Sequence, residues 1–441
     1  HDYSICSFLI NMKFSIITPI HKTNPYLVEL YDSIVAQTYS NWEWVLYLNS
    51  EMSRSKLPNQ IREDDRVVVY EDYSSDGFYD RGGNKSGGKI GYYKHHAFFK
   101  GTGDVLVEVD YDDLLTPDCL EELNIAYQDE EVGFVYSDVT YWKEGEDYEE
   151  WFNSDYGWGQ KHEEFRGNKT ITHVNFPPSS VTYGHIWFQP DHIRSWRKTL
   201  YHELGGHNVE LPYLDDQELM IRTYLSNTKI KEIPKTLYIY RLTDSQATDQ
   251  TRDEMQYKCV DIFHQYAFDL ALKDCEKRNL LAVDLGGGHW QVEGLLNIDQ
   301  SDSADIKCDL NEGIPLEDNT CGLINASHII EHLYDPFKTM SEIHRVLAHG
   351  GWAFIEVPST DGRGAFQDPT HVSFWNENSF WYYTQQSKAQ FIGNDKVRFM
   401  TKRLETGHYG EFNEQNNILN TIAWLVAVKD DDNRLPGLLE I

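Results

Sequence analysis

The feature that most constrains this chain is a short apolar run that ends in clustered acids. Residues 103–117 read Gly-Asp-Val-Leu-Val-Glu-Val-Asp-Tyr-Asp-Asp-Leu-Leu-Thr-Pro, and the β-branched residues in this run favour a buried strand. Asp110, Asp112 and Asp113 follow the run, and Thr116-Pro117 is typical of a helix N-cap with proline at the first helical position. A strand that delivers carboxylates to its carboxyl end places them where open α/β sheets bind ligands.

Carboxylates crowded in this way repel one another unless a hard divalent cation lies between them. Asp110 and Asp112 are therefore candidate ligands of Mg²⁺ or Mn²⁺, an ion that could neutralise a diphosphate as it leaves. The alternative interpretation is that Asp112 and Asp113 only cap a helix and face water. The surrounding chain decides between the two.

The size and charge of the chain narrow its class. A length of 441 residues suggests two or three domains. The formal charge of −32 argues against nucleic-acid and anionic-membrane partners, because phosphates would be repelled. The six cysteines are scattered without a C-x-x-C pair, which favours a reducing, cytoplasmic compartment. No apolar run approaches the roughly 18 residues that a membrane span needs. The oligomeric state does not follow from the sequence.

Strand and helix patterns alternate through the first half of the chain. Such alternation predicts a parallel α/β sheet with right-handed crossovers. Strands are expected at 14–20, 42–48, 66–70, 134–138 and 235–241, and helices at 24–37 and 89–100.

Four stretches of this half occur in the order and at the spacing of a known family. They read Phe-Ser-Ile-Ile-Thr-Pro from residue 14, Ser-Ile-Val-Ala-Gln-Thr-Tyr-Ser-Asn-Trp-Glu from 33, Ala-Phe-Phe-Lys-Gly-Thr-Gly-Asp from 97 and Asp-Tyr-Asp-Asp-Leu-Leu-Thr-Pro from 110. In these motifs the chain, over roughly 14–245, resembles family-2 glycosyltransferases of the GT-A fold. The resemblance implies a nucleotide-sugar donor, with Asp110 and Asp112 holding the metal on its diphosphate.

The resemblance also implies nucleotide contacts at the ends of the first two strands. Thr18 lies in the first motif, and Asn49 stands where the family usually places an aspartate that meets the nucleobase. Asn49 could still hydrogen-bond a base through its amide. The donor is therefore expected to be a UDP- or GDP-sugar, and the acceptor a glycan.

Leu214-Asp215-Asp216-Gln217 opens a further expected helix. In the resembled family this position carries the carboxylate that acts as general base on the acceptor hydroxyl. An inverting sugar transfer is a single displacement, so some group must take the acceptor's proton. Asp216 is the first choice for this role and Asp215 the second, and the alternative is that one of them is only the helix N-cap.

The second half begins with a strand that runs into glycines, Leu-Leu-Ala-Val-Asp-Leu-Gly-Gly-Gly at 280–288. Glycine lets the backbone approach a ligand closely and adopt positive φ. Asp299 ends the next strand and suits a ribose diol. Only nine residues separate Leu285 from Leu295, fewer than a helical crossover needs. The usual first helix is therefore expected to be missing or reduced to a loop.

In four motifs this half, over about 279–430, resembles compact class I S-adenosylmethionine-dependent methyltransferases. The motifs are Asp-Leu-Gly-Gly-Gly, Asn-Ile-Asp, His-Ile-Ile-Glu-His-Leu and Arg-Val-Leu-x-x-Gly-Gly. The resemblance implies that Asp284, Gly286 and Gly288 line the methionine end of S-adenosylmethionine. It also implies that Asp299 holds the ribose hydroxyls and that Asp309 and Leu310 flank the adenine. A dehydrogenase is the alternative for glycines followed by an acid, but Gln291 stands where the third glycine of G-x-G-x-x-G would be.

Two histidines are candidates for a base in methyl transfer. They are His328 and His371, and either could instead only orient the substrate. Glu331 and His332 are expected to have structural roles.

The chain is therefore expected to be an α/β protein with two enzymatic domains. A GT-A domain at 12–245 would be followed by a helical connector at 246–278 and a Rossmann-like methyltransferase domain at 279–441, with Met12 resembling a natural start. The leading hypothesis is a bifunctional enzyme of glycan biosynthesis. The alternative is a methyltransferase whose first half is a non-catalytic nucleotide- or glycan-binding module, supported only by Asn49.

Overall fold

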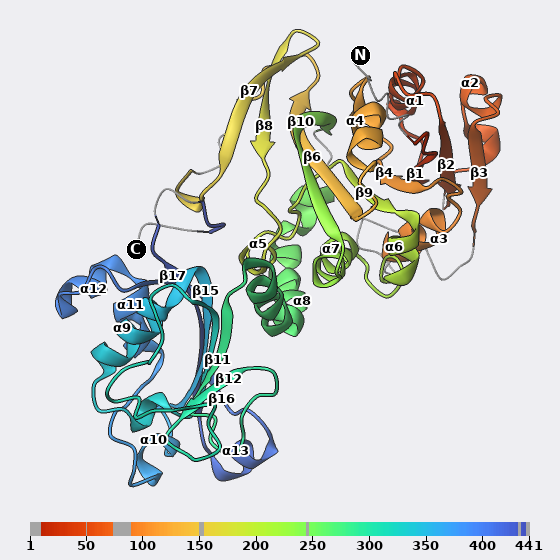
Figure 1. The fold of residues 1–441 in the computed structure, drawn as a ribbon. Coiled ribbons are helices and arrows are strands. Elements are labelled where there is room, and N and C mark those ends of the chain that lie inside the picture. Colours follow the sequence, from red (N-terminus) through yellow and green to blue (C-terminus); the bar gives the residue numbers. More distant parts are fainter. Residues whose placement is uncertain are drawn as a thin grey trace, which may run out of the picture. The chain divides into compact units, whose positions relative to one another are not determined.

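The computed structural model describes residues 10–49, 51–73, 90–149, 154–243, 247–430 and 434–437. The chain divides into two compact units. Unit 1 comprises 1–154, 158–178 and 186–263, and unit 2 comprises 155–157, 179–185 and 264–441. Each unit contains its own sheet (Figure 1). The division falls within α8 (Ala247–Arg278), a helix of 32 residues.

The sheet of unit 1 begins with four parallel strands in the order β3-β2-β1-β4. Chain progression reverses at β1, so the carboxyl ends of β1 and β4 flank a switch point, where open α/β sheets bind ligands. The strands are β1 (Phe14–Ile20), β2 (Trp42–Leu48), β3 (Val67–Glu71) and β4 (Val105–Glu108).

The same sheet continues from β4 through β9, β6 and β10 to β5, and β7 and β8 branch from β6. Here β9 is antiparallel to β4 and to β6, whereas β10 is parallel to β6. These strands are β5 (Leu114–Leu115), β6 (Val132–Lys143), β7 (Gly159–Phe165), β8 (Asn168–Val174), β9 (Arg194–Arg197) and β10 (Lys229–Leu242).

One helix start differs from the expectation. Leu114 and Leu115 pair with β10, which keeps them extended, and α4 begins only at Cys119 with Asp118 in the N-cap position. The prediction of an N-cap at Thr116 is therefore wrong by two residues.

Helices α1 and α4 share one apolar core with the sheet of unit 1. Leu30 and Ile34 of α1 and Leu120 of α4 pack in the same cluster as Ile16 and Val107. The helices of this unit are α1 (Leu27–Val35), α2 (Asn59–Arg62), α3 (Ile90–Phe98), α4 (Cys119–Ala126), α6 (Lys198–Glu203) and α7 (Asp215–Leu225), with a 3₁₀ turn at Arg54–Lys56; a second 3₁₀ turn, Ser154–Tyr156, lies where the chain passes from unit 1 to unit 2.

The sheet of unit 2 has the order β13-β12-β11-β14-β15-β17-β16. The first five strands are parallel, and β17 and β16 add antiparallel pairs. The switch point lies between β11 and β14. The strands are β11 (Leu281–Leu285), β12 (Leu296–Asp299), β13 (Ile306–Lys307), β14 (Cys321–Ser327), β15 (Leu347–Pro358), β16 (Arg398–Gly407) and β17 (Asn420–Val428).

The connection from β11 to β12 contains no helix, although the two strands are parallel. All of its residues, 286–295, are described, so the expected loss of the first crossover helix is confirmed. A short loop, residues 286–295, therefore connects the end of β11 to the start of β12.

The helices of unit 2 pack against both faces of its sheet. Met340 and Ile343 of α9 lie in a core cluster with Val283 and Ile355, and Phe268 of α8 packs against Phe354 on β15 with ring centroids 5.2 Å apart. These helices are α5 (Ser180–Tyr183), α9 (Pro336–Val346), α10 (Gly364–Gln367), α11 (Glu377–Thr384), α12 (Gln386–Ile392) and α13 (Glu411–Asn416), with a 3₁₀ turn η4 at Ile330–His332.

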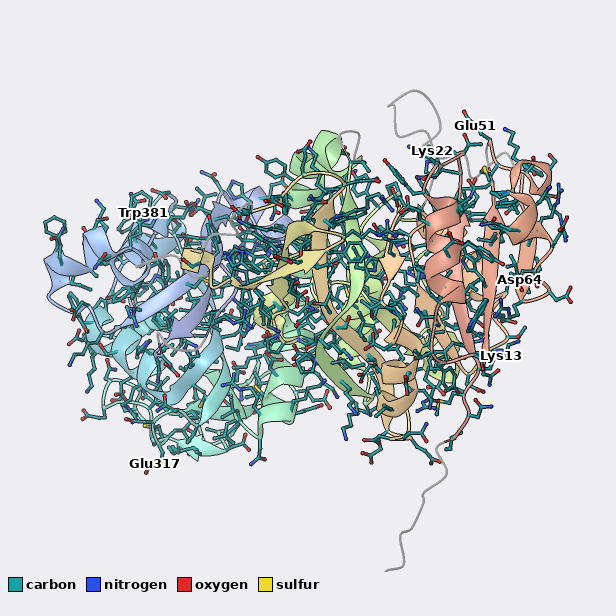
Figure 2. All side chains as sticks on the ribbon, turned by 90° about the horizontal axis from the view of Figure 1, so that it is seen from above. Lys13, Lys22, Glu51, Asp64, Glu317 and Trp381 are labelled. Atoms are coloured by element: carbon teal, nitrogen blue, oxygen red, sulfur yellow. The ribbon has the colours of Figure 1, made fainter. Side chains whose placement is uncertain are left out.

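Charged side chains surround both units, as the sticks of Figure 2 show; the labelled Glu51 and Glu317 are among the exposed ones. Within the described ranges, no helix combines the length and the apolar character needed to cross a membrane.

Candidate functional site

The acidic loop after β4 keeps one carboxylate inside the protein and leaves two at the edge of the sheet. Asp113 is 2% exposed, and its oxygens accept hydrogen bonds from the Tyr238 hydroxyl at 2.7 Å and from the Arg241 amide at 2.8 Å. Asp110 and Asp112 are partly exposed. The interpretation of Asp113 as a cap that faces water is therefore wrong, because two groups of β10 hold its carboxylate in the interior.

The charges in this loop favour a cation. Burial raises the pKa of Asp113, and the carboxylates of Asp112 and Asp110 raise it further. Like charges this close make each ionised form less favourable, and a bound cation relieves that repulsion. Two partly exposed carboxylates beside a buried third one fit an oxygen-preferring ion such as Mg²⁺ or Mn²⁺. The Nε–H of Arg241 donates to the Asp112 carbonyl at 2.9 Å, which fixes the loop backbone.

A network of buried charges connects the end of β4 to the start of α7. Lys94 on α3 forms an ion pair with Glu108, and their side chains are only 10% and 2% exposed. Arg194 on β9 lies 3.8 Å from Glu108 and 2.7 Å from Asp216, and it donates further hydrogen bonds to two backbone carbonyls. Glu108 on β4 and Asp216 on α7 are therefore linked through the side chain of Arg194.

This network keeps Asp216 ionised. Burial would raise the pKa of Asp216, but the charges of Arg194 and Lys94 outweigh burial and lower it. Glu108 behaves in the same way, with its pKa held well below the usual range by Lys94 and Arg194. The Asp216 side chain is 16% exposed, so its carboxylate is both charged and accessible.

Asp215 lies in a different environment from its neighbour. It is 2% exposed, and its Oδ2 lies 3.8 Å from Nε2 of His207. Burial is the main cause that raises the pKa of Asp215 to about 7, and the charges of Asp216 and Glu108 raise it while Lys94 lowers it. Burial also lowers the pKa of His207 to about 3, so that imidazole is neutral and brings no compensating charge.

The two expected nucleotide contacts occupy interior positions. Thr18 is fully buried, and its hydroxyl accepts a hydrogen bond from the Trp44 indole at 3.0 Å. The Thr18 hydroxyl therefore fixes a tryptophan on the neighbouring strand, and a contact of Thr18 with the nucleotide stays a prediction. Asn49 is 1% exposed. Its backbone N–H donates to the Ile20 carbonyl at 3.0 Å, and this hydrogen bond joins the ends of β1 and β2.

In unit 2 the aspartate of the glycine-rich turn braces the turn itself. Asp284 is 2% exposed; its oxygens accept hydrogen bonds from the Val292 amide and from the Asn325 side chain, both at 2.8 Å. A Cβ added to Gly287 would lie 2.4 Å from the Asp284 carboxylate, so the turn packs directly on it. Asp284 therefore supports the backbone of the turn, and its contact with the cofactor stays a prediction.

The two glycines assigned to cofactor binding adopt conformations that suit glycine. Gly286 and Gly288 have φ of +70° and +51°. A Cβ on Gly286 would lie 2.4 Å from Ile329, the second residue after β14. Lack of a side chain at Gly286 therefore allows the turn after β11 to meet the chain that follows β14, at the switch point of the sheet.

The remaining cofactor candidates lie close to this turn. Ser303, in the loop after Asp299, donates to the Gly288 carbonyl at 3.1 Å, and the Cys308 amide donates to the Asp299 carbonyl at 2.9 Å. Asp299 is partly exposed, Asp309 is exposed and Leu310 is 9% exposed. The structure thus brings the glycine turn, Asp299 and Asp309 to one edge of the sheet.

His328 is held between two carboxylates. Its Nδ1 lies 3.5 Å from Glu331 and its Nε2 lies 3.6 Å from Glu356. The neighbouring carboxylates of Glu331 and Glu356 raise the pKa of His328 to about 9, against the opposing effect of burial. A histidine with such a pKa is cationic at neutral pH and carries no lone pair for a proton, which makes it unsuitable as a general base.

His371 is arranged differently. Its side chain is 7% exposed, and its Nδ1 is 2.9 Å from the Ala365 carbonyl. A carbonyl can only accept, so Nδ1 carries a hydrogen, and Nε2 is the nitrogen that can accept a proton when the ring is neutral. His371 is therefore the candidate histidine that can act through Nε2.

Several residues of these sites escaped the sequence analysis. Lys94, Glu108 and Arg194 carry the buried charge network, and Tyr238 with Arg241 holds Asp113. Glu108 offered a signal, because a carboxylate inside an otherwise apolar strand needs a buried partner. Arg194 offered none, since its pairing with Asp216 joins residues from different elements.

Comparisons with known proteins agree with this arrangement. The family model described as glycosyl transferase family 2 matches residues 15–193, and the model described as a methyltransferase domain matches residues 251–355. The chain therefore carries a family-2 glycosyltransferase domain of the GT-A type, followed by a methyltransferase domain. It is an enzyme of both classes, a glycosyltransferase and a methyltransferase. No curated protein matches the chain.

Solved structures similar to the chain include two from S. aureus and one from an archaeon. TarS residues 1–349 of S. aureus with UDP-GlcNAc match with a TM-score of 0.42 and 17% identity, over 60% of this chain and 67% of that one. A longer TarS structure matches with a TM-score of 0.41 and 16% identity, over 61% of this chain and 43% of that one. The mannosyltransferase PcManGT of Pyrobaculum calidifontis with GDP-Man and Mn²⁺ matches with a TM-score of 0.37 and 14% identity, over 58% of this chain and 70% of that one.

Proposed function

We propose that this protein transfers a sugar from a UDP- or GDP-sugar to a glycan acceptor with inversion, and methylates a glycan or its precursor with S-adenosylmethionine. The two reactions are assigned to a glycosyltransferase domain at 12–245 and a methyltransferase domain at 279–441, joined by the helical connector 246–278. Cytoplasmic nucleotide sugars and S-adenosylmethionine would serve both domains.

The acidic loop after β4 is the observation that carries the first half of the proposal. Asp113 is fixed by β10, whereas Asp110 and Asp112 remain at the sheet edge beside the switch point. Asp110 and Asp112 would hold a Mn²⁺ or Mg²⁺ ion, which supplies charge to neutralise the diphosphate leaving group. The protein contributes a loop backbone that is already fixed, so these carboxylates need not reorganise on binding.

Asp216 is proposed as the general base. Its carboxylate is ionised and partly exposed, and Arg194 fixes one oxygen at 2.7 Å. A positioned base takes the proton of the acceptor hydroxyl as that oxygen attacks the sugar carbon from the face opposite the diphosphate. Asp215 remains the second choice, because it is more deeply buried and is half protonated near pH 7.

The edge formed by the glycine turn and Asp299 is proposed to bind S-adenosylmethionine, the cofactor that the methyltransferase domain implies. Asp299 would hold the ribose hydroxyls, Asp309 and Leu310 would flank the adenine, and the backbone of Gly286 and Gly288 would face the methionine end. Methyl transfer is an in-line displacement whose rate depends mainly on positioning. His371, rather than cationic His328, is proposed to act on the acceptor side through Nε2.

A nucleotide-sugar panel tests the sugar-transfer half. Full-length protein is incubated with UDP- and GDP-sugars with and without Mn²⁺, and hydrolysis and transfer products are separated. We expect turnover with one nucleotide class, dependent on metal and lost in Asp112→Ala. Metal-dependent nucleotide binding without turnover would support the alternative of a non-catalytic binding module. Calorimetry with S-adenosylhomocysteine tests the methyl half; no binding would contradict it.

A further inference from the structure

Three potential ligand residues meet in unit 2 outside the proposed cofactor contacts. One ligand atom from each of Glu331, His332 and His371 lies within 4.8 Å of the other two. Glu331 and His332 belong to the 3₁₀ turn after β14, and His371 follows α10. The rings of His332 and His371 have centroids 5.0 Å apart and are inclined by 73°.

The backbone holds the two segments of this cluster together. The amides of Val372 and Ser373 donate to the Glu331 carbonyl at 2.9 and 3.0 Å, and the Ser373 hydroxyl donates to the Ile330 carbonyl at 2.9 Å. The three ligand residues are therefore presented by a fixed frame and not by a chance approach of surface side chains.

Both histidines have the tautomer that a metal ligand requires. Nδ1 of His371 is 2.9 Å from the Ala365 carbonyl, and Nδ1 of His332 is 3.2 Å from the Thr370 carbonyl. Because carbonyl oxygens only accept, each Nδ1 carries a hydrogen, and in the neutral ring Nε2 is then the nitrogen with the lone pair. A metal-ligating histidine commonly donates its other ring N–H to a carbonyl in this way, which fixes the orientation of the ring.

The Glu331 carboxylate lies buried beside the cluster and shares its charged neighbour His328 with a second carboxylate, which leaves negative charge that a bound cation would offset. The residue is 2% exposed, and neither of its oxygens has a hydrogen-bond partner among the described residues. Nδ1 of His328 lies 3.5 Å from Glu331, and Nε2 of the same ring lies 3.6 Å from Glu356, so two carboxylates share one imidazole. A buried carboxylate without hydrogen bonds is costly unless it is paired or coordinates a metal.

We propose that Glu331, His332 and His371 bind one divalent transition-metal ion in the methyltransferase domain. Two imidazoles and one carboxylate suit Zn²⁺, Co²⁺, Ni²⁺ or Fe²⁺, whereas Mg²⁺ and Ca²⁺ prefer oxygen ligands alone. Ligand atoms around an ion at about 2.1 Å lie about 3 to 3.5 Å apart, so ligand atoms of the cluster would approach one another by up to roughly 1 to 2 Å on binding. This site is distinct in chemistry from the all-oxygen site of Asp110 and Asp112.

Three protein ligands leave at least one position open for a substrate atom. The cluster begins two residues after Ile329, which packs against the glycine turn at Gly286. A hydroxyl of the methyl acceptor bound at the open position would lose its proton more readily, since a metal lowers the pKa of a bound hydroxyl. In this arrangement Nε2 of His371 acts as a ligand to the metal.

The test measures metal binding and not methyl transfer, so its failure is distinguishable from failure of the proposed function. Full-length protein without a histidine tag is prepared with Asp110→Asn and Asp112→Asn, which removes the oxygen site. After treatment with a chelator it is titrated with Co²⁺, and the visible d–d absorption is followed, with Zn²⁺ as competitor.

We expect one equivalent of Co²⁺ with nitrogen-ligand absorption, displaced by Zn²⁺. Glu331→Gln and His371→Asn should each weaken binding by more than about 100-fold, because loss of an outer partner alone costs about 10- to 100-fold. His202→Asn, in an exposed histidine of α6, is the matched control and should bind as the parent does.

Absence of Co²⁺ binding in the parent protein would overturn the proposal, as would equal binding by Glu331→Gln and His202→Asn. Glu331→Gln preserves side-chain size, and circular dichroism confirms its fold before titration. If His371→Asn does not fold, His332→Gln replaces it, and the rise in melting temperature with Zn²⁺ in the parent but not in Glu331→Gln gives a second measure.

Discussion

Nη1 of Arg194 lies 2.7 Å from Oδ2 of Asp216, in a position where the arginine side chain is only 2% exposed. The same nitrogen lies 3.8 Å from Glu108, so one guanidinium serves two acids. This relationship determines the charge state of the proposed base. Three of the predictions below concern this pair and its surroundings, and a fourth concerns the cofactor site of unit 2.

Arg194→Met should destabilise the glycosyltransferase unit. It leaves Glu108 and Asp216 without their shared cation, and breaking a buried pair in this way costs about 3–5 kcal/mol. Lys229→Met removes an exposed ion pair with Asp129 and is the control, with no measurable change expected. Thermal unfolding by circular dichroism measures the difference. Equal melting temperatures for the two variants would show that the buried network does not stabilise the unit.

Asp216→Asn should reduce kcat for sugar transfer by about 10²- to 10⁴-fold, the usual contribution of a general base. Asp215→Asn should retain more activity, because that side chain faces His207 in the interior. The two variants differ by one position and carry the same change of charge, so each is the control for the other. A larger loss in Asp215→Asn would reverse the assignment of the base.

Asp215 should make stability depend on pH. Its pKa is raised from 3.8 to about 7 in the folded chain, so its protonated form stabilises the fold. This contribution is complete below the unfolded pKa and is lost as pH rises through the folded pKa. Relative to the parent, Asp215→Asn should therefore gain in melting temperature between about pH 4 and pH 7 and level off above that range. Asp65→Asn, at an exposed position, is the control. A difference that is constant with pH would contradict the raised pKa.

Asp299→Ala should weaken the binding of S-adenosylhomocysteine, measured by calorimetry, by about 10-fold or more. The variant loses a hydrogen bond to a charged group, and a loss of about 1.4 kcal/mol corresponds to a tenfold change in affinity. Asp302→Ala is the matched control; Asp302 lies in the same loop, and its side chain is 96% exposed. Equal affinities of the two variants would remove Asp299 from the ribose contact.

The sequence was sufficient where a local pattern has a single physical meaning. The apolar runs at 14–20 and 42–48 became β1 and β2 with the same bounds, because their burial on both faces requires a continuous apolar strand. The short spacing after Leu285 excluded a crossover helix, because too few residues were present to form one. The order of motifs pointed to both domain families.

Local pattern was insufficient where the role of a side chain depends on a distant partner. The sequence assigned Thr18 and Asp284 to ligands and gave no sign that they also hydrogen-bond Trp44 and Asn325. His328 was a candidate base until two carboxylates from separate segments were found to hold it cationic. Such pairings are not encoded in spacing along the chain.

The acidic stretch after residue 103 illustrates both limits. By itself the sequence determined that a buried strand delivers three carboxylates to the edge of an α/β sheet. Only the tertiary structure decided among them, because Tyr238 and Arg241, more than 100 residues away, hold Asp113 in the interior. Burial and hydrogen bonding by β10 thus separate one structural carboxylate from the two that remain at the surface, a distinction that depends on folding and not on residue type.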